Sequence, residues 1–434
     1  MWTAMGVILF VVGLLLSIAW HEAGHLTFAK LFKVRTTQYM IGFGRTLFSR
    51  RRGETEYGIK AIPLGGYIRM VGMVPPGRDG HQRITTTAFG PAGMIRQIIE
   101  DSRRGDRAQV IESDDGRQFY QLHPFKRIVV MLAGPAQNLI FALVLFGIIV
   151  LGVGLPTPVP RIEQVNQCVV AAGAPATCTA ATPPTPAAQA GLRPGDTIVA
   201  FDGQDIADWA ALSRLIQGSA GRTVALSYVR DGARNTVRIP IITNQIAVLH
   251  GQGAQTATRP AGFLGVQAAT DYQTQSIGTA FTMTGSFIGR AAEAVVKIPA
   301  RIPALWESIF DGKKRDANSP VGIVGAGRFS GEILGSAAPA KSKLLLFLQL
   351  LAAFNMSLFL LNLLPLLPLD GGHILGAVIE WIRRGWARLR RHTDPGPFDV
   401  AKLMPVAYVV ALLFIGLSVL TFVADIVNPV QLPT

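Results

Sequence analysis

Four long apolar segments constrain this chain more than any other feature of its sequence. They cover about residues 5–28, 128–155, 344–367 and 406–427. Each reaches the roughly 20 residues that a helix needs to cross a bilayer. Only 16% of the 434 residues are charged, against roughly 25% in soluble proteins. The sequence therefore predicts a polytopic α-helical membrane protein with four transmembrane helices.

The first apolar segment could also be a secretory signal peptide. No basic residue precedes it, and no small-x-small cleavage site follows it. Polar residues interrupt it at His21, Glu22 and His25, and apolar residues with helical spacing resume at Leu26. We therefore expect a retained helix.

Basic residues are concentrated in two of the segments between the spans. Residues 29–127 contain 18 Lys and Arg, and the positive-inside rule places both basic segments in the cytoplasm and both termini outside it. A net charge of +14 could also indicate a nucleic-acid partner. No nucleic-acid-binding motif accompanies it, so we expect none. The second basic segment carries Arg383, Arg384, Arg388, Arg390, Arg391 and Lys402.

The long segment between spans two and three contains a predicted α+β domain. A strand-like alternation over 223–230 is followed by a turn at Asp231-Gly232 and a second strand near 236–239. Apolar residues over 209–216 have helical spacing. The run from Gly191 to Ile198, Gly-Leu-Arg-Pro-Gly-Asp-Thr-Ile, resembles the PDZ family. That resemblance implies an extracytoplasmic PDZ-like domain that either adds a peptide as an extra strand or excludes bulky substrates.

The only two cysteines, Cys168 and Cys178, lie in or beside this domain. On the oxidising side of the membrane they could form a disulfide. Closing so short a loop would stabilise the fold by about 2–3 kcal/mol. Two unpaired thiols are the alternative.

The first apolar segment carries a metal-binding pattern, His21-Glu22-Ala23-Gly24-His25. Histidines four apart share one face of a helix and can bind one metal ion. The adjacent Glu22 can take a proton from a metal-bound water, which is the logic of zinc hydrolases. Two interior histidines bonded to neighbouring helices are the alternative. A carboxylate in an apolar span is costly without a partner, however, and a metal ion supplies one.

A catalytic zinc needs a third protein ligand. The next carboxylates, Glu54 and Glu56, lie in the basic cytoplasmic segment, whereas Asp370 is the one carboxylate in an apolar run of about thirty residues. Prolines and glycines beside Asp370 would break the helix and let the backbone turn toward the site. We therefore expect Asp370 to be the third ligand.

His21-Glu22-x-x-His25 and Asn362-x-x-Pro-x-x-x-Leu-Asp370-Gly together resemble the site-2 protease family. The PDZ-like domain and the four spans are similar to its bacterial regulator-of-sigma-E branch. The resemblance implies a metalloendopeptidase with one Zn²⁺ per chain, bound by both histidines and Asp370, with Glu22 as the general base. It implies intramembrane cleavage of single-span substrates, typically anti-sigma factors first trimmed by a site-1 protease. The expected location is the bacterial inner membrane, in contact with the lipid bilayer.

Other segments resemble parts of the same family. Residues 42–44 and 59–67 resemble a membrane-reentrant β hairpin, and Gly65 and Gly66 within it would contact the substrate; a plain cytoplasmic hairpin is the alternative. Asn362 and Asn355 would hold the substrate backbone, although Asn355 could equally form an interhelical hydrogen bond. His373 is expected to make a polar contact rather than bind metal. Residues 319–323 match a family segment without a derivable role.

Two other functions remain open, an inactive PDZ-containing membrane scaffold and a metal or proton transporter. The intact Glu22 argues against the scaffold, which would not need a general base. The absence of an inverted repeat argues against the transporter.

The stretch 291–297 is amphipathic and either lies on the membrane surface or forms an ordinary helix. The sequence divides into eight parts. The parts are transmembrane helix 1 (1–32), a cytoplasmic loop with the hairpin (33–127), transmembrane helix 2 (128–155), a linker and PDZ-like domain (156–250), an amphipathic region (251–343), transmembrane helix 3 (344–373), a basic cytoplasmic loop (374–404) and transmembrane helix 4 (405–428).

Overall fold

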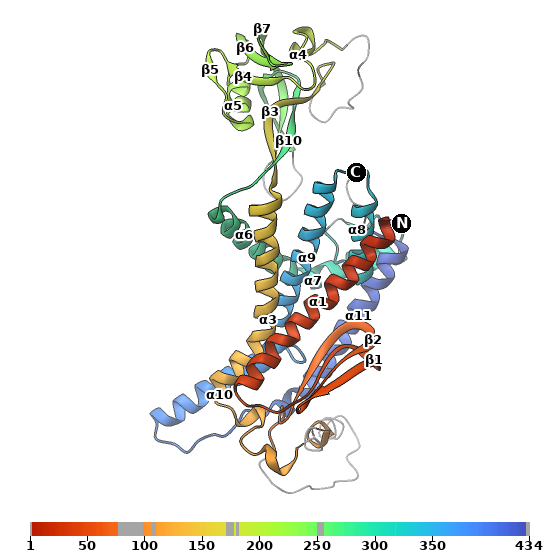
Figure 1. Cartoon of the computed structure of the whole chain (residues 1–434), viewed down its shortest axis with the longest axis vertical. Helices are drawn as coiled ribbons and strands as arrows, with labels where there is room; N and C mark the ends of the chain where they lie inside the picture. The colour runs from red at the N-terminus through yellow and green to blue at the C-terminus, as the bar shows by residue number, and fades with distance from the viewer. Residues whose placement is uncertain are drawn as a thin grey trace. The chain divides into compact units, whose positions relative to one another are not determined.

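The computed structural model forms two compact units (Figure 1). The first combines residues 1–151 with 276–434, and the second contains 152–275. The residues that the structure describes are 2–76, 99, 101–105, 110–170, 178, 182–249, 256–316 and 318–430.

Four helices of the first unit, within these described ranges, are long and apolar enough to cross a membrane, as predicted. They are α1 (Trp2–Leu31), α3 (Pro124–Gly147, continued by π-helical turns to Val153), α9 (Ala340–Asn362) and α11 (Met404–Val427, preceded by a 3-10 turn from Val400). Large apolar side chains on α11 face outward, with Leu412 67% and Leu413 69% exposed. Such a surface is typical of a helix that faces lipid.

Small residues let the helices approach α1 closely. A Cβ added to Gly24 would lie 2.4 Å from the carbonyl oxygen of Ala133 in α3. One added to Gly6 would lie 2.4 Å from the carbonyl oxygen of Ser330 in α8 (Ile323–Gly335). Close backbone approach through glycine is the usual way in which membrane helices gain packing contacts. Both the amino-terminal and the carboxyl-terminal half of α1 are held in this way.

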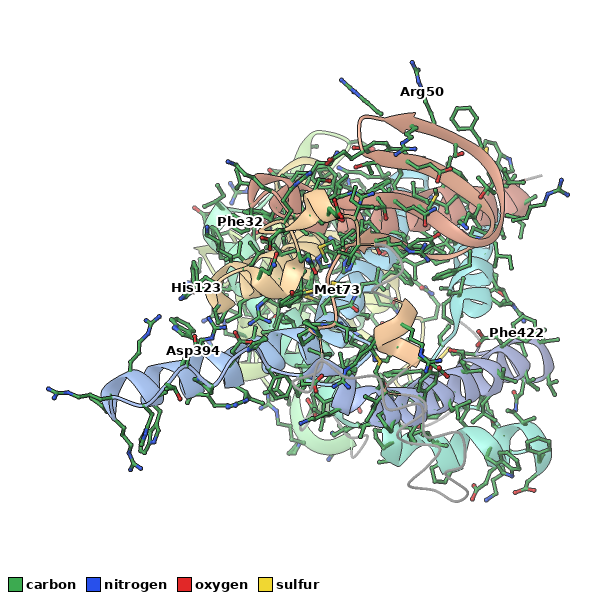
Figure 2. All side chains as sticks on the ribbon, turned by 90° about the horizontal axis from the view of Figure 1, so that it is seen from below. Phe32, Arg50, Met73, His123, Asp394 and Phe422 are labelled. Carbon is green, nitrogen blue, oxygen red and sulfur yellow. A yellow bond between two sulfur atoms is a disulfide. The ribbon has the colours of Figure 1, made fainter. Side chains whose placement is uncertain are left out.

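The third span ends earlier than the predicted residue 373. Helix α9 stops at Asn362, and a turn containing Pro365 and Pro368 leads to α10 (Asp370–Leu389). Proline disfavours the helical conformation of the preceding residue and removes an N–H donor, which explains the break. The part assigned as a basic loop is therefore helical as far as Leu389, and Figure 2 shows α10 projecting from the other helices of this unit.

The predicted hairpin is present as β1 (Thr36–Arg52) and β2 (Thr55–Met70), which pair antiparallel. Both strands bend, so that Met40 pairs with Tyr67 on one side and with Gly58 on the other. Figure 1 shows the curved hairpin beside α1, and Figure 2 shows Arg50 pointing away from it. Five of its large apolar side chains are exposed: Phe43, Leu47, Phe48, Ile59 and Ile62.

The segment at 319–323 has a structural role in this fold. It leads into α8, and the N–H groups of Gly322 and Gly325 donate hydrogen bonds of 3.0 and 2.8 Å to Oδ2 of Asp425 in α11. Arg315 donates to Oδ1 of the same carboxylate at 2.9 Å. Because Asp425 is buried, this pairing fixes the start of α8 against the end of α11. The predicted amphipathic stretch 291–297 falls at the end of α6 (Ile277–Val296), which is followed by α7 (Ile298–Phe310).

The second unit is an α+β fold around a sheet of order β10-β3-β4-β6-β7, with β5 on β4. As predicted, β6 and β7 are joined at Asp231-Gly232, where both residues have positive φ. Helix α5 lies where helical spacing was recognised, and the buried core includes Ile198, Leu212 and Leu226. The elements are β3 (Leu155–Val165), α4 (Pro186–Gln189), β4 (Thr197–Phe201), β5 (Gln204–Asp205), α5 (Trp209–Gly218), β6 (Thr223–Arg230), β7 (Ala233–Pro240), β8 (Ile242–Leu249), β9 (Thr256–Phe263) and β10 (Val266–Gln273).

The boundary predicted after residue 250 differs from the structure. Residues 256–275, expected to lie in the amphipathic region, belong to the second unit, because β9 pairs with β8 and β10 pairs with β3. In the same unit a disulfide joins Cys168 to Cys178.

Candidate metal centre

Helix α1 brings His21 and His25 together, as their spacing predicts. Both imidazoles are buried, and their Nε2 atoms lie 3.2 Å apart. A four-residue separation places the two side chains on one face, one turn apart. The helix is uninterrupted through this region, so the backbone fixes their relative position.

Asp370 reaches the same point from the other end of the chain. It is the first residue of α10, and its Oδ2 atom lies 3.3 Å from Nε2 of each histidine. Two glycines after it permit the tight turn. A Cβ on Gly371 would lie 2.1 Å from the carbonyl oxygen of Leu364, and one on Gly372 would lie 2.6 Å from the nitrogen of Leu367. The expectation that this segment turns toward α1 therefore has a specific steric basis.

The three donor atoms fit a tetrahedral metal ion. Metal–ligand distances of about 2.0–2.1 Å, typical of zinc, place two tetrahedral ligand atoms about 3.3 Å apart. The observed separations are 3.2, 3.3 and 3.3 Å. Oδ2 of Asp370 is buried without a hydrogen-bond partner among the described residues. Three electron-pair donors facing one another in a buried space suit a bound cation, and within the described ranges this is the one such cluster of His, Cys, Asp and Glu.

Glu22 lies beside this cluster and against the hairpin. Its side chain is buried and contacts the backbone of Ile68 in β2. A Cβ added to Gly66 would lie 2.8 Å from Cγ2 of Ile18 and 3.2 Å from Cγ of Glu22, so glycine lets β2 pack closely against α1 here. Tyr39 of β1 donates a hydrogen bond of 2.7 Å to the carbonyl oxygen of Ala19 in α1. The hairpin is thus joined to α1 just before the metal-binding pattern.

Gly65, Asn355 and Asn362 differ in their surroundings. Gly65 has a φ of +118°, and a Cβ there would lie 2.6 Å from Phe43. Asn355 is fully buried and donates to Oγ of Ser17 and to the carbonyl oxygen of Leu351, both at 2.9 Å, which favours the interhelical alternative. Asn362 is the last residue of α9 and only partly buried, and within the described part of the chain its side chain has no hydrogen-bond partner.

Other candidate ligands are engaged elsewhere or are not part of the cluster. Glu54 accepts two hydrogen bonds from Arg117, at 2.6 and 2.8 Å, and these hold the pKa of Glu54 below its usual range. Glu56 accepts one from Gln38. His373 is not a member of the metal-binding group, and desolvation lowers its pKa to about 4, which keeps the ring neutral.

Two contacts from α3 were missed in the sequence. Asn138 lies 3.0 Å from Nδ1 of His21, measured from its Nδ2 atom, and the carbonyl oxygen of Val130 lies 2.8 Å from Nδ1 of His25. Asn138 is fully buried. The available sequence signal was a single asparagine in the second apolar segment. The spacing of residues along one helix does not show which residue of another helix this asparagine contacts.

Comparison with known proteins places the chain in a family. The model of "Peptidase family M50" matches residues 9–393. The chain is 33% identical over 435 residues to zinc metalloprotease Rip1 of Mycobacterium tuberculosis, with 98% of each chain covered. It is 32% identical over 438 residues to zinc metalloprotease Rip1 of Mycolicibacterium smegmatis, with 99% of this chain and 98% of that one covered. The protein described here therefore belongs to peptidase family M50, the site-2 protease family.

Proposed function

We propose that this protein is a zinc-dependent endopeptidase of the bacterial inner membrane that cuts the transmembrane segment of single-span proteins. Its family makes it a metalloprotease with Zn²⁺ as cofactor, and its apolar helices make it a multi-pass membrane protein. One observation carries the finer proposal. The three donor atoms of His21, His25 and Asp370 converge where apolar spans meet, and Glu22 lies beside them.

Each residue of the centre has a separate role in this proposal. His21, His25 and Asp370 would hold one Zn²⁺ and leave a fourth position open. Zn²⁺, when bound, would supply Lewis acidity to the attacking water. Glu22 would act as the general base that takes up a proton from the water and returns it to the nitrogen of the leaving amine. Its side chain is buried, which shields the carboxylate from bulk water.

The hairpin is proposed to present the substrate. A peptide bond in a helix must become extended before it can be attacked, and an exposed strand edge binds extended peptides through main-chain hydrogen bonds. The contact between Gly66 and Glu22 supports this role, since it places β2 beside the general base. We assign Gly65 and Gly66 to the substrate path. We assign the role of holding the substrate backbone to Asn362, whose side-chain amide is available at the end of α9. Asn355 is not assigned this role, because it bonds to Ser17.

The second unit is proposed to be an extracytoplasmic PDZ-like domain. Its support is the sequence run from Gly191 to Ile198, the helix α5 and the antiparallel strands around it. A disulfide between Cys168 and Cys178 fits an oxidising compartment. The domain would either bind a peptide or exclude substrates with a bulky extracytoplasmic part. With this orientation both termini of the chain are extracytoplasmic.

A buried active site with a folded domain outside the membrane suits substrates that have already lost most of their extracytoplasmic part. We therefore propose trimmed anti-sigma factors as the substrate class and a site-1 protease as the enzyme that acts first. The rival functions make different predictions. A PDZ scaffold would not need Glu22, and a transporter would move metal or protons without cutting a protein.

The proposal is tested by comparing membrane fragments in cells that carry wild type or Glu22→Gln. The amide keeps the size of the side chain but cannot accept the proton, so trimmed single-span fragments accumulate in the variant. Glu112→Gln is the matched control, because Glu112 is an exposed carboxylate outside the centre. Undiminished cleavage by Glu22→Gln would contradict the mechanism.

A further inference from the structure

Helix α3 contacts both candidate metal-binding histidines at Nδ1, the ring nitrogen that does not face Asp370. The carbonyl oxygen of Val130 lies 2.8 Å from Nδ1 of His25, and the side chain of Asn138 lies 3.0 Å from Nδ1 of His21. Asn138 is fully buried, so water does not compete for this contact. The two contacts come from residues eight apart, which lie near one face of a helix.

Gly134 lies midway between these two residues and explains why α3 comes so close. A Cβ at this position would lie 2.1 Å from Nε2 of His25, within the ring's own space. Gly24 of α1 has the same role on the other side of the helix contact, since a Cβ added there would lie 2.4 Å from the carbonyl oxygen of Ala133. The two helices are therefore in backbone contact at the centre, and the positions of Val130 and Asn138 relative to the imidazoles are tightly fixed.

Metal binding by the triad would determine which nitrogen of each ring carries the proton. The Nε2 atoms of His21 and His25 face each other and Oδ2 of Asp370, so both would offer their lone pairs to the bound ion. Each Nδ1 must then carry the hydrogen and needs an acceptor. For His25 this acceptor is the carbonyl oxygen of Val130, which can only accept.

We propose that Asn138 is a positioning residue that accepts the Nδ1 hydrogen of His21 through its side-chain oxygen. This inference rests on the metal-binding role proposed for His21. As placed, Nδ2 of Asn138 faces the ring, while its Oδ1 atom is buried and has no hydrogen-bond partner among the described residues. A half-turn of the carboxamide exchanges the two atoms and leaves the shape of the side chain unchanged. This half-turn directs the side-chain oxygen of Asn138 to Nδ1 of His21, which carries the hydrogen when Nε2 is free to bind metal.

Such a contact acts on the metal through the histidine. Fixing the ring orientation and the tautomer keeps the Nε2 lone pair directed at the ion, and the loss of a partner of this kind typically lowers metal affinity about 10- to 100-fold. Asn138 itself touches neither the metal-binding atoms of the triad nor the substrate path assigned above. Its effect should therefore be visible in zinc binding, without any substrate present.

The test measures zinc affinity of the purified full-length chain by competition with a chromophoric chelator. Asn138→Leu removes the acceptor at similar size and is expected to weaken zinc binding about 10- to 100-fold. Asn138→Asp retains an acceptor oxygen and is expected to bind zinc within a few-fold of wild type. Asn355→Leu is the matched control, since it removes another buried asparagine that bonds to α1, at Ser17, and leaves both imidazoles untouched. Its zinc affinity is expected to stay near that of wild type.

Three results would overturn the inference: wild-type affinity in Asn138→Leu, equal weakening in Asn138→Asp, or equal weakening in Asn355→Leu, which would indicate a general packing effect. His21→Ala separates this failure from failure of the proposed function. If His21→Ala keeps full zinc affinity, the proposed ligand set is wrong. If it loses zinc while Asn138→Leu does not, the ligand set stands and Asn138 has no positioning role.

Discussion

Oδ2 of Asp370 lies 3.3 Å from Nε2 of His25, although the two residues belong to opposite ends of the chain. The contact depends on distant parts of the first unit. Helix α3 must hold α1 in place, and the turn after α9 must bring the start of α10 back to α1. Neither α1 nor α10 alone has a complete ligand set. A metal ion bound there would join α1 to the start of α10, the helix that follows the third span.

Replacing Asp370 by alanine is expected to remove most of the bound zinc. The variant keeps two histidine ligands but loses the only carboxylate of the cluster, so zinc content should fall from about one ion per chain to a small fraction. Elemental analysis of the purified protein measures this directly. Asp394→Ala is the control, because Asp394 is an exposed residue after α10. Unchanged zinc in Asp370→Ala would remove Asp370 from the ligand set.

Replacing Gly134 by alanine is expected to disturb the centre through a single methyl group. The added Cβ would lie 2.1 Å from Nε2 of His25, and overpacking of this kind typically costs about 1–3 kcal/mol. Zinc affinity should fall together with thermal stability. Gly147→Ala, at the end of the same helix, is the matched control, since nothing lies within 4 Å of its added Cβ. Equal behaviour of the two variants would show that the ring can move aside without loss.

The cluster of His21, His25 and Asp370 was predictable because its signals are local. His21 and His25 are four apart on one helix, and Asp370 stands alone in an apolar run beside prolines and glycines. The four spans follow from length and composition in the same way. Strands β6 and β7 of the second unit also have local alternation, and a recognisable turn joins them.

Contacts between distant segments could not be predicted from these local signals. Asn138 contacts His21 only because Gly24 and Gly134 let α1 and α3 approach, and one helix pattern does not show the rotation of its neighbour. The membership of 256–273 in the second unit depends on the pairing of β10 with β3, which are separated by most of that unit. Such pairings are decided by tertiary packing rather than by local propensity.

The pairing of Asp196 with Arg230 predicts how the second unit responds to acid. Burial raises the pKa of Asp196, but hydrogen bonds from Arg230 and from the N–H of Arg193 outweigh it and hold that pKa below its usual value. A carboxylate with a lowered folded-state pKa stabilises the fold above the unfolded value, near 3.9. That stabilisation is lost as the pH falls through the folded value.

Asp196→Ala should therefore loosen β4 and β6 at neutral pH and show less further loss below about pH 4. Hydrogen exchange of peptides from these strands is expected to be roughly tenfold faster in the variant at pH 7. Arg222→Ala is the control, since Arg222 and Asp202 form an ion pair in which both side chains are exposed. The prediction fails if the control accelerates exchange as much as Asp196→Ala does.

The disulfide between Cys168 and Cys178 predicts both the location and the stability of the second unit. Cytosolic thiols stay reduced, so a stable bond requires this unit to lie outside the cytoplasm. A maleimide reagent of high mass should therefore label denatured wild type only after reduction, whereas Cys168→Ser should be labelled once without it. Losing the closed loop should destabilise the unit by about 2–3 kcal/mol and increase its cleavage by trypsin. The double variant, which carries no thiol, controls for labelling elsewhere. Two labelled thiols in unreduced wild type would contradict both the bond and the extracytoplasmic placement.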